Sequence, residues 1–198
     1  VYDGEDHLQR FDITGGDILI EGKGLGGKET ESLAILSRAV KINAGIWAED
    51  LHITTGANTV DAKTLEASAI EGKGGRPAFA LDTAAIGGMY AGRITLVGTE
   101  KGLGVNNSGT WSAEDNLTLD WNGDLKNSGT IYSKGNADLR ASHLENDKTI
   151  AAERNLSAAA KENIRNQGKL LAGENMDIYA GKTLDNAGHA MESGNNLS

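Results

Sequence analysis

Four aspartates are the residues of this sequence best suited to chemistry. Asp120, Asp124 and Asp138 fall in neighbouring stretches of a repeating pattern, and Asp177 recurs at an equivalent place. Carboxylates that converge along one outward strand face could bind calcium or act as acid and base on a polysaccharide. Ser157 interrupts the series between Asp138 and Asp177. Because alternating strands place polar residues outward in any case, we favour a solvated outer face, with a carbohydrate-active lyase or hydrolase as the alternative.

Other catalytic and metal-binding patterns are missing from the sequence. The chain has no Cys, which removes thiol catalysis and Cys-ligated zinc. No Gly-x-Ser-x-Gly elbow occurs, and the Gly-rich stretches at 22–27 and 72–75 lack the form of a phosphate-binding loop. We therefore predict no catalytic residue, no bound metal and no cofactor. The histidines are scattered rather than closely paired, at His7, His52, His143 and His189.

Several aromatic residues could stack on sugars or on a protein partner. Trp111 occupies the place that Ile131 occupies one repeat later, so we expect it in the core. Trp121, Tyr132 and Tyr179 do not align in this way, and they are the better candidates for exposed contact with a glycan or a partner. A plain surface or corner role is the alternative for these three. The aromatic residues considered are Trp47, Tyr90, Trp111, Trp121, Tyr132 and Tyr179.

The composition favours an all-β protein that does not bind nucleic acid. Gly is abundant at 27 residues, Pro occurs once and aromatic residues make up 5% of the chain, so many tight turns must join short apolar stretches. The formal net charge is −9, and no basic face is left to hold nucleic acid or anionic lipid. The sequence has neither a long apolar run nor an amino-terminal export signal, so a signal would precede Val1.

A repeat of about 20 residues predicts the fold. Asn-Ser-Gly-Thr begins at Asn107 and again at Asn127, with an aliphatic residue two positions before the later Asn residues and apolar–polar–apolar triplets after them. Since side chains alternate across a strand, each triplet sends two residues inward, and similar coils stack at roughly 4.8 Å. Asn and Gly enter left-handed backbone at low cost and mark the corners. We predict an all-β parallel β-helix with corners at Asn107, Asn127, Asn146, Asn166 and Asn186 and a buried column of Leu125, Leu144, Ile164 and Leu184.

Residues 1–106 follow the same plan less regularly. The run from Asn43 to Ala48 resembles the run from Asn107 to Ser112. Segments near 22–31 and 54–79 are Gly-rich or polar and break the repeat. We predict that both segments leave the shaft as excursions, with small hairpins of their own.

The excursion near 54–79 holds three cationic residues in a chain that is otherwise acidic. They are Lys63, Lys73 and Arg76. Loops carried on a rigid scaffold are where recognition is usually found, so these side chains are candidate contacts for a partner. The alternative is that the excursion only covers the flank of the β-helix.

Two stretches of the first half carry a family resemblance. Ser37 to Ala48 reads Ser-Arg-Ala-Val-Lys-Ile-Asn-Ala-Gly-Ile-Trp-Ala, and Ile86 to Val105 begins Ile-Gly-Gly-Met-Tyr-Ala-Gly-Arg. Both resemble late signatures in the secretion domain of the filamentous haemagglutinin-like exoproteins of two-partner secretion, a family that includes haemolysins and contact-dependent inhibition proteins. The coils from Asn107 onward look like haemagglutinin repeats. The resemblance thus implies that residues 1–106 are the carboxyl-terminal part of a secretion-type domain, continuous with repeat coils at 107–198.

The resemblance also implies where such a protein works. It implies a right-handed β-helix that is exported through an outer-membrane transporter, the second partner, and displayed on the bacterial cell surface. A receptor or glycan on host or bacterial cells is the further partner that it suggests. The Asn-Pro motifs of the early secretion domain are absent, and Pro77 is the only proline, so this segment is not expected to drive secretion alone. We expect a non-catalytic shaft of an adhesin or toxin-delivery protein, with a carbohydrate-active enzyme as the alternative.

Overall fold

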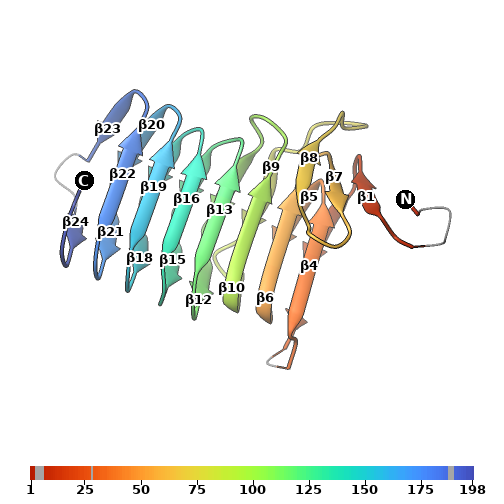
Figure 1. Cartoon of the computed structure of the whole chain (residues 1–198), viewed down its shortest axis with the longest axis horizontal. Helices are drawn as coiled ribbons and strands as arrows, with labels where there is room; N and C mark the ends of the chain where they lie inside the picture. The colour runs from red at the N-terminus through yellow and green to blue at the C-terminus, as the bar shows by residue number, and fades with distance from the viewer. Residues whose placement is uncertain (3–6, 28, 187–189) are drawn as a thin grey trace.

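The structure is a computed structural model of the chain and describes residues 1–2, 7–27, 29–186 and 190–198. These residues form strands joined by turns and loops, with no helix among them. Accordingly, no helix of the described residues is long and apolar enough to cross a membrane. The strands lie side by side along the long axis, and the termini lie at opposite ends (Figure 1). The predicted all-β parallel β-helix is confirmed.

Regular coils begin at Gly104, and each pairs in parallel with the next. The first strand of a coil joins an 8-stranded sheet, and the other two join a 13-stranded sheet, counted over the described residues. Leu125 pairs with Leu144 and Leu144 with Ile164, so equivalent residues are 19 or 20 apart. The strands are β11 (Gly104–Asn107), β12 (Thr110–Ala113), β13 (Leu117–Trp121), β14 (Leu125–Asn127), β15 (Thr130–Ser133), β16 (Ala137–Ala141), β17 (Leu144–Asn146), β18 (Thr149–Ala152), β19 (Leu156–Ala160), β20 (Asn163–Asn166), β21 (Lys169–Ala172), β22 (Met176–Ala180), β23 (Thr183–Asp185) and β24 (Ala190–Ser193).

The first half builds the same sheets partly from longer strands. The eleven-residue strand β10 pairs with β12 through its beginning, Gly88–Ala91, and with β13 through its end, Ile94–Gly98. A single strand therefore covers two faces of the shaft that later coils cover with two strands. The shaft strands of this half are β2 (Asp17–Ile20), β3 (Leu25–Gly26), β4 (Ser32–Ser37), β5 (Ala39–Ile42), β6 (Gly45–Thr55), β9 (Phe79–Thr83) and β10 (Gly88–Gly98).

Part of the segment near 22–31 lies in a coil, which differs from the prediction that the segment leaves the shaft. Its strand β3 pairs in parallel with β6 at Ile46 and Trp47. Gly24 and Gly26 have φ angles of 84° and 76°, where a residue with a Cβ is strained. A Cβ at Gly26 would also collide with the Trp47 backbone oxygen. The glycines that obscure the repeat in the sequence therefore allow this coil to pack closely against the next.

The excursion after β6 forms a small antiparallel sheet. Its strands β7 (Asn58–Asp61) and β8 (Ala67–Ala69) make a hairpin, and β1 (Arg10–Ile13) pairs with the other side of β7. The chain then returns to the shaft at β9. Val40 in β5 pairs with Leu81 in β9, so one coil spans 41 residues where a regular coil spans 19 or 20.

The predicted aliphatic column is buried over three of its four residues. Leu125, Leu144 and Ile164 are at most 1% exposed, and they pair in register with one another. Leu184 also pairs in register with Ile164, but it is 46% exposed, contrary to the prediction. It lies on β23, which ends the 8-stranded sheet, and no further described coil covers it. Since a solenoid coil is buried by its neighbours, the last one keeps an open side.

The predicted corner asparagines form a ladder of side chains that is fully buried from Asn107 to Asn166. Each donates from its Nδ2 to the Oδ1 of the next, over 2.8 Å from Asn107 to Asn127 and from Asn127 to Asn146, and 2.7 Å from Asn146 to Asn166. The Asn166 amide donates in turn to Asn186 Oδ1 over 2.6 Å. Their backbone is not left-handed, since the only non-glycine residue with positive φ in the described part is Leu65. These residues therefore mark the corners through side-chain amides that satisfy each other inside the shaft.

Candidate functional site

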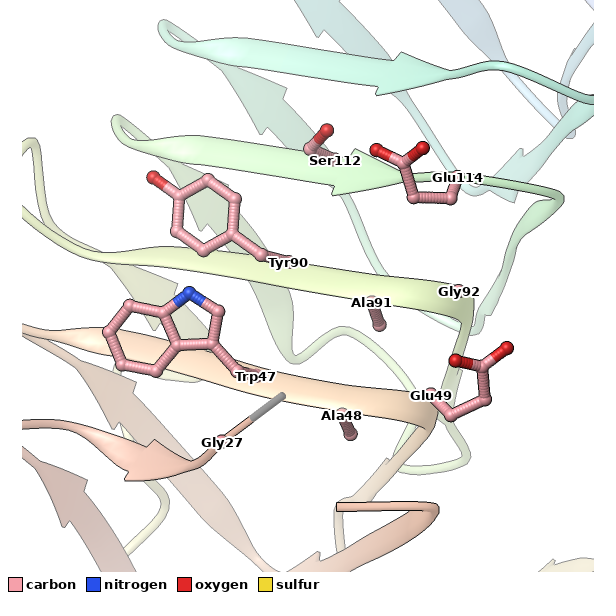
Figure 2. A pocket seen from close by; sticks show the side chains of 9 residues that line it. All are labelled: Gly27, Trp47, Ala48, Glu49, Tyr90, Ala91, Gly92, Ser112 and Glu114. Carbon is pink, nitrogen blue, oxygen red and sulfur yellow. The ribbon is translucent and has the colours of Figure 1, made fainter. Parts of the chain in front are cut away.

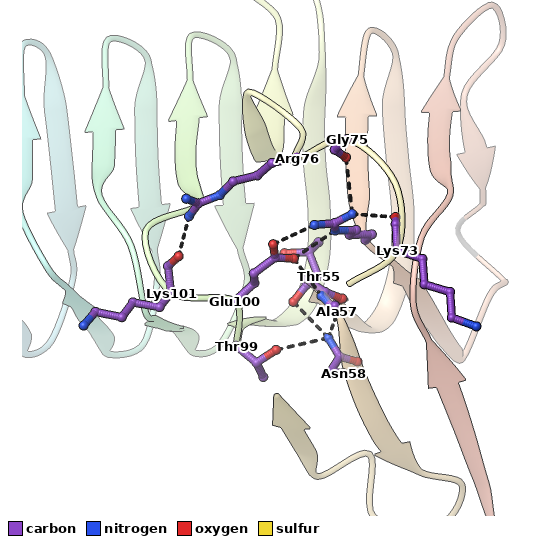
Figure 3. Close-up of polar contacts among 11 residues, drawn as sticks. Thr55, Ala57, Asn58, Lys73, Gly75, Arg76, Thr99, Glu100 and Lys101 are labelled. Carbon is purple, nitrogen blue, oxygen red and sulfur yellow. Dashed lines mark hydrogen bonds and ion pairs between the residues drawn. The ribbon is translucent and has the colours of Figure 1, made fainter. Parts of the chain in front are cut away.

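A largely buried ion pair ties the excursion to the shaft (Figure 3). The Arg38 guanidinium, at the corner between β4 and β5, donates to both carboxylate oxygens of Glu100 over 2.9 and 3.0 Å. Its Nη1 also donates to the backbone oxygens of Lys73, at 2.8 Å, and Gly75, at 3.3 Å. The Glu100 carboxylate accepts from the backbone N–H of Ala57 over 3.0 Å. The pair thus holds the segment where it leaves the shaft and where it returns, and we call these contacts the clamp.

The ion pair of the clamp is mostly shielded from solvent, and both of its side chains are charged. The side chains of Arg38 and Glu100 are 7% and 18% exposed. The hydrogen bond from Arg38 holds the pKa of the Glu100 carboxyl below its ordinary value, and the same bond raises the pKa of Arg38. A buried bidentate pair with extra hydrogen bonds is the geometry in which attraction can offset the cost of desolvation. The clamp therefore keeps both charges across the neutral range.

The three cationic candidates of the excursion do not form one cluster. All three are exposed. Figure 3 shows the side chains of Lys73 and Arg76 pointing in opposite directions, and the Arg76 guanidinium donates to the backbone oxygen of Lys101. Lys63 lies in the β7–β8 turn, where its N–H donates to the Asp61 carboxylate over 2.8 Å. Lys63 and Lys73 remain available to a partner, whereas Arg76 already fastens the loop to the shaft.

Trp121 is buried, and the prediction that it is an exposed contact is wrong. It is 2% exposed, and its indole N–H donates to the backbone oxygen of Leu103 over 2.8 Å. Trp121 stands four residues after Leu117 in β13, so strict alternation sends both side chains inward. Gly98, its partner in β10, provides room, because a Cβ there would collide with the indole ring. Trp111 is fully buried, as the repeat predicts.

The two tyrosine candidates lie in different surroundings. The Tyr132 hydroxyl donates to the Glu153 carboxylate one coil away, and this hydrogen bond raises the pKa of Tyr132. Tyr179 is 66% exposed and lies beside a shallow hollow of about 160 Å³, which Arg140 and Lys161 also line. Of these two phenols, Tyr179 is the one whose ring is open to a partner.

The aspartates of the repeating face do not gather into a metal cluster. Asp138 pairs with Arg140 over 2.8 Å, and Asp124 accepts from the His143 ring over 2.8 Å. Within the described part of the chain, no group of three His, Asp or Glu side chains stands close enough to hold a metal ion. His189 lies outside the described residues.

Two features escaped the sequence-based selection of functional residues. Arg38 and Glu100 lie 62 residues apart, and no local spacing connects them. Trp47 and Tyr90 pack together on the outer surface, with ring centroids 6.0 Å apart. A signal for the second pair is present in the sequence, because each aromatic follows a glycine by two residues, in Gly45-Ile-Trp47 and Gly88-Met-Tyr90.

Comparisons with known proteins agree with this architecture. Residues 3–133 match the TPS secretion domain family, where TPS denotes two-partner secretion, and residues 133–198 match the haemagglutinin repeat. The crystal structure of the filamentous hemagglutinin secretion domain matches with a TM-score of 0.51 over 96% of this chain and 54% of that chain. At 20% sequence identity, that likeness concerns the fold alone.

Relatives named CdiA are similar in sequence. Toxin CdiA of Yersinia pestis is 40% identical over an alignment of 152 positions that covers 65% of this chain and 5% of that protein. The tRNA nuclease CdiA of Yersinia mollaretii is 37% identical over 175 residues, which are 88% of this chain and 6% of that protein. The chain thus spans only about a twentieth of the length of these relatives. With the match to the secretion domain covering most of its residues, the chain belongs to the TPS secretion domain family and continues into haemagglutinin repeats, as part of a secreted bacterial surface protein.

Proposed function

We propose that this chain is a non-catalytic shaft segment of a large surface protein that an outer-membrane two-partner secretion transporter exports. The observation that carries the proposal is the continuity of the parallel solenoid. The secretion-type part and the repeat part share both large sheets, and the two family matches meet at residue 133 without a break between coils. A rod built in this way extends by adding coils and needs no catalytic centre.

Several features of the chain suit passage across a membrane before folding. Each coil is completed by its neighbours, so a chain that emerges coil by coil finds a template in the coils already folded. The lack of Cys means that no disulfide can form early and obstruct passage. The buried asparagine ladder adds one neutral rung per coil and requires no ion or cofactor for assembly.

The shaft holds other regions of the parent protein at a distance from the cell surface. The relatives that match this chain are named as toxins and nucleases, and the matched residues are only a small share of each. We propose that this protein likewise delivers a toxin or an adhesive domain that lies elsewhere in the parent chain. The excursion with Lys63 and Lys73 is one part of this segment that contacts a receptor on a host or bacterial cell, because it is the exposed interruption of an otherwise regular surface.

The transporter dependence is tested on intact cells. The parent protein is produced with and without its outer-membrane transporter, and an antibody against this segment labels the cell surface. Labelling should require the transporter, and equal labelling without it would contradict the proposal.

A matched pair of deletions tests the shaft itself. Removing residues 127–145 takes out one complete coil, joins Asn107 to the register of Asn146 and should shorten the rod by roughly 4.8 Å while preserving β-sheet content and surface display. Removing only residues 127–136 takes out half a coil, which moves the following strands onto the wrong faces of the shaft, and should abolish both. Equal tolerance of the two deletions would argue against a register-dependent shaft.

A further inference from the structure

Two aromatic side chains form a solvent-facing pair on the outer surface of β6 and β10. Trp47 and Tyr90 are register partners on these adjacent strands. Their ring centroids are 6.0 Å apart, and their planes differ by 16°. Figure 2 shows both rings broadside, one on each strand. The side chains are 36% and 40% exposed, so much of the pair remains open to solvent. We call Trp47 and Tyr90 the aromatic platform.

Glycines hold the platform flat against the sheet. Gly45 and Gly88 precede the two aromatic residues by two positions and therefore share their outward face. A Cβ at Gly45 would collide with the indole ring, and a Cβ at Gly88 would lie 2.8 Å from the Tyr90 ring. Each ring thus covers a position that a side chain would otherwise occupy. The rings are fixed before any ligand arrives, which reduces the entropy that binding must overcome.

Polar groups border the platform on one side. A groove of about 350 Å³ runs beside the rings and is also lined by Glu49, Ser112 and Glu114. Figure 2 shows the Glu49 and Glu114 carboxylates at the same end of the strands. Glu114 is paired with Lys134, whereas the Glu49 carboxylate makes no hydrogen bond or ion pair with another described residue. The site therefore combines ring surfaces with a hydroxyl and carboxylate oxygens that can accept hydrogen bonds.

We propose that the aromatic platform binds a neutral oligosaccharide of a cell surface. A sugar ring has an apolar face that can lie on an aromatic ring and hydroxyls at its edge that can donate to carboxylates. Two rings on adjacent strands offer places for two successive sugars. The acidic border opposes sulfated or sialylated chains. An ammonium group is recognised best when several rings surround it, and two nearly parallel rings form no such cage.

Tryptophan fluorescence of the purified chain provides a selective measurement. Trp111 and Trp121 are buried, so an exposed sugar can reach only Trp47 among the three tryptophans. The probes are maltohexaose, cellohexaose, mannopentaose and lacto-N-tetraose, with heparin and polylysine as charged comparators. At least one neutral probe should change the fluorescence saturably. Failure of all four neutral probes, or a response confined to heparin or polylysine, would overturn the proposal.

Matched variants locate the site. Tyr90→Ala and Trp47→Ala should weaken binding of the responding sugar at least tenfold, measured by calorimetry, whereas Tyr179→Ala should leave it unchanged because that exposed ring lies on another face. Glu49→Gln changes no ring and should weaken binding severalfold even if an aromatic variant fails to fold. Equal binding by Glu49→Gln and by a folded Tyr90→Ala would overturn the assignment. The inference rests on the proposed function only in placing the sugar on a cell surface. Sugar binding by the purified chain is tested independently of export.

Discussion

The regular coils and the coil that carries the excursion stabilise their interiors with different chemistry. In the regular coils, a neutral asparagine amide meets an identical amide in the next coil, and the arrangement recurs every 19 or 20 residues. In the excursion coil, one buried ion pair between Arg38 and Glu100 closes a spacing of 41 residues between paired strand positions. A neutral ladder is extended by each added coil, whereas a buried charge pair depends on both partners being present. The difference shows how a repeating shaft can carry an insertion: local periodicity is replaced by one long-range contact.

The largest expected effect comes from charging the core of the regular coils. Leu144→Asp places an unpaired carboxylate in a position that is 1% exposed, and it should lower the free energy of unfolding by more than about 4 kcal/mol. Denaturant unfolding followed by circular dichroism measures the loss. The control, Glu145→Gln, changes an outward neighbour and should cost no more than about 1 kcal/mol. A small effect of Leu144→Asp would contradict the buried register.

Breaking the clamp should have the next largest effect, and a local one. Arg38→Met leaves the Glu100 carboxylate and two backbone oxygens without their partner, and it should cost about 3–5 kcal/mol. Amide hydrogen exchange should accelerate over residues 57–78 and remain slow in the regular coils. Arg93→Met is the control, because its pair with Asp50 is exposed. Unchanged protection of residues 57–78 in the Arg38 variant would show that the hairpin stands without the clamp.

Removing one rung tests the ladder. Asn146→Ala leaves the Asn127 amide and the Asn166 oxygen without their side-chain partner, and it should cost about 1–3 kcal/mol in denaturant unfolding. The control is Lys126→Ala, which changes an outward side chain on the neighbouring strand β14. A cost no greater than that of Lys126→Ala would mean that the rungs set register without contributing stability.

Lowering the pH should destabilise the excursion before it destabilises the regular coils. The pKa of Glu100 is lowered below its ordinary value of 4.5, so the clamp contributes its full stability above that pH and loses it as pH falls through the lower value of the folded state. The amide ladder does not titrate there. Limited proteolysis on descending pH should therefore cut the excursion before the regular coils. Glu100→Gln should leave the excursion open to cleavage at every pH and so remove the pH dependence. Simultaneous cleavage of both regions in the unmodified chain would argue against the distinction.

The smallest structural effect is expected from the exposed lysines of the excursion. Replacing Lys63 and Lys73 together with Ala should change the free energy of unfolding by no more than about 0.5 kcal/mol, because both side chains are exposed. Attachment of cells that display the parent protein should nevertheless fall if the excursion touches a receptor. Lys126→Ala, on the regular coils, is the control for attachment. Equal attachment by the unmodified protein, the double lysine variant and Lys126→Ala would show that Lys63 and Lys73 do not contribute to receptor contact.

The sequence could predict what repeats and could not predict what occurs once. The spacing of Asn107 and Asn127 defines a coil, and stacking follows because strand pairing at a fixed register buries equivalent residues. The exposure of Leu184 depends on the absence of a described covering coil, which its own spacing does not reveal. Local alternation alone would have placed Trp121 inside, since its distance from Leu117 is even.

The candidate sites were less predictable because they depend on contacts between distant segments. The sequence marks residues 54–79 as irregular, but the pairing of Arg38 with Glu100 brings together residues from two coils and an excursion. No periodicity encodes a contact that is made once. The aromatic platform is an intermediate case: each glycine–aromatic spacing is local, whereas the approach of Trp47 to Tyr90 depends on a 43-residue offset across the excursion.

Parallel stacking also determines how this shaft would bear a mechanical load. The hydrogen bonds between successive coils run along the long axis, so tension on the two ends pulls these bonds open directly instead of sliding strands past one another (Figure 1). A terminal coil should peel away before interior ones, and each regular coil of about 20 residues would release roughly 66–72 Å of extended chain. Stretching a single molecule would then give a series of similar steps, with one longer step where the excursion coil yields. Such a rod can lengthen under drag while its remaining coils stay folded.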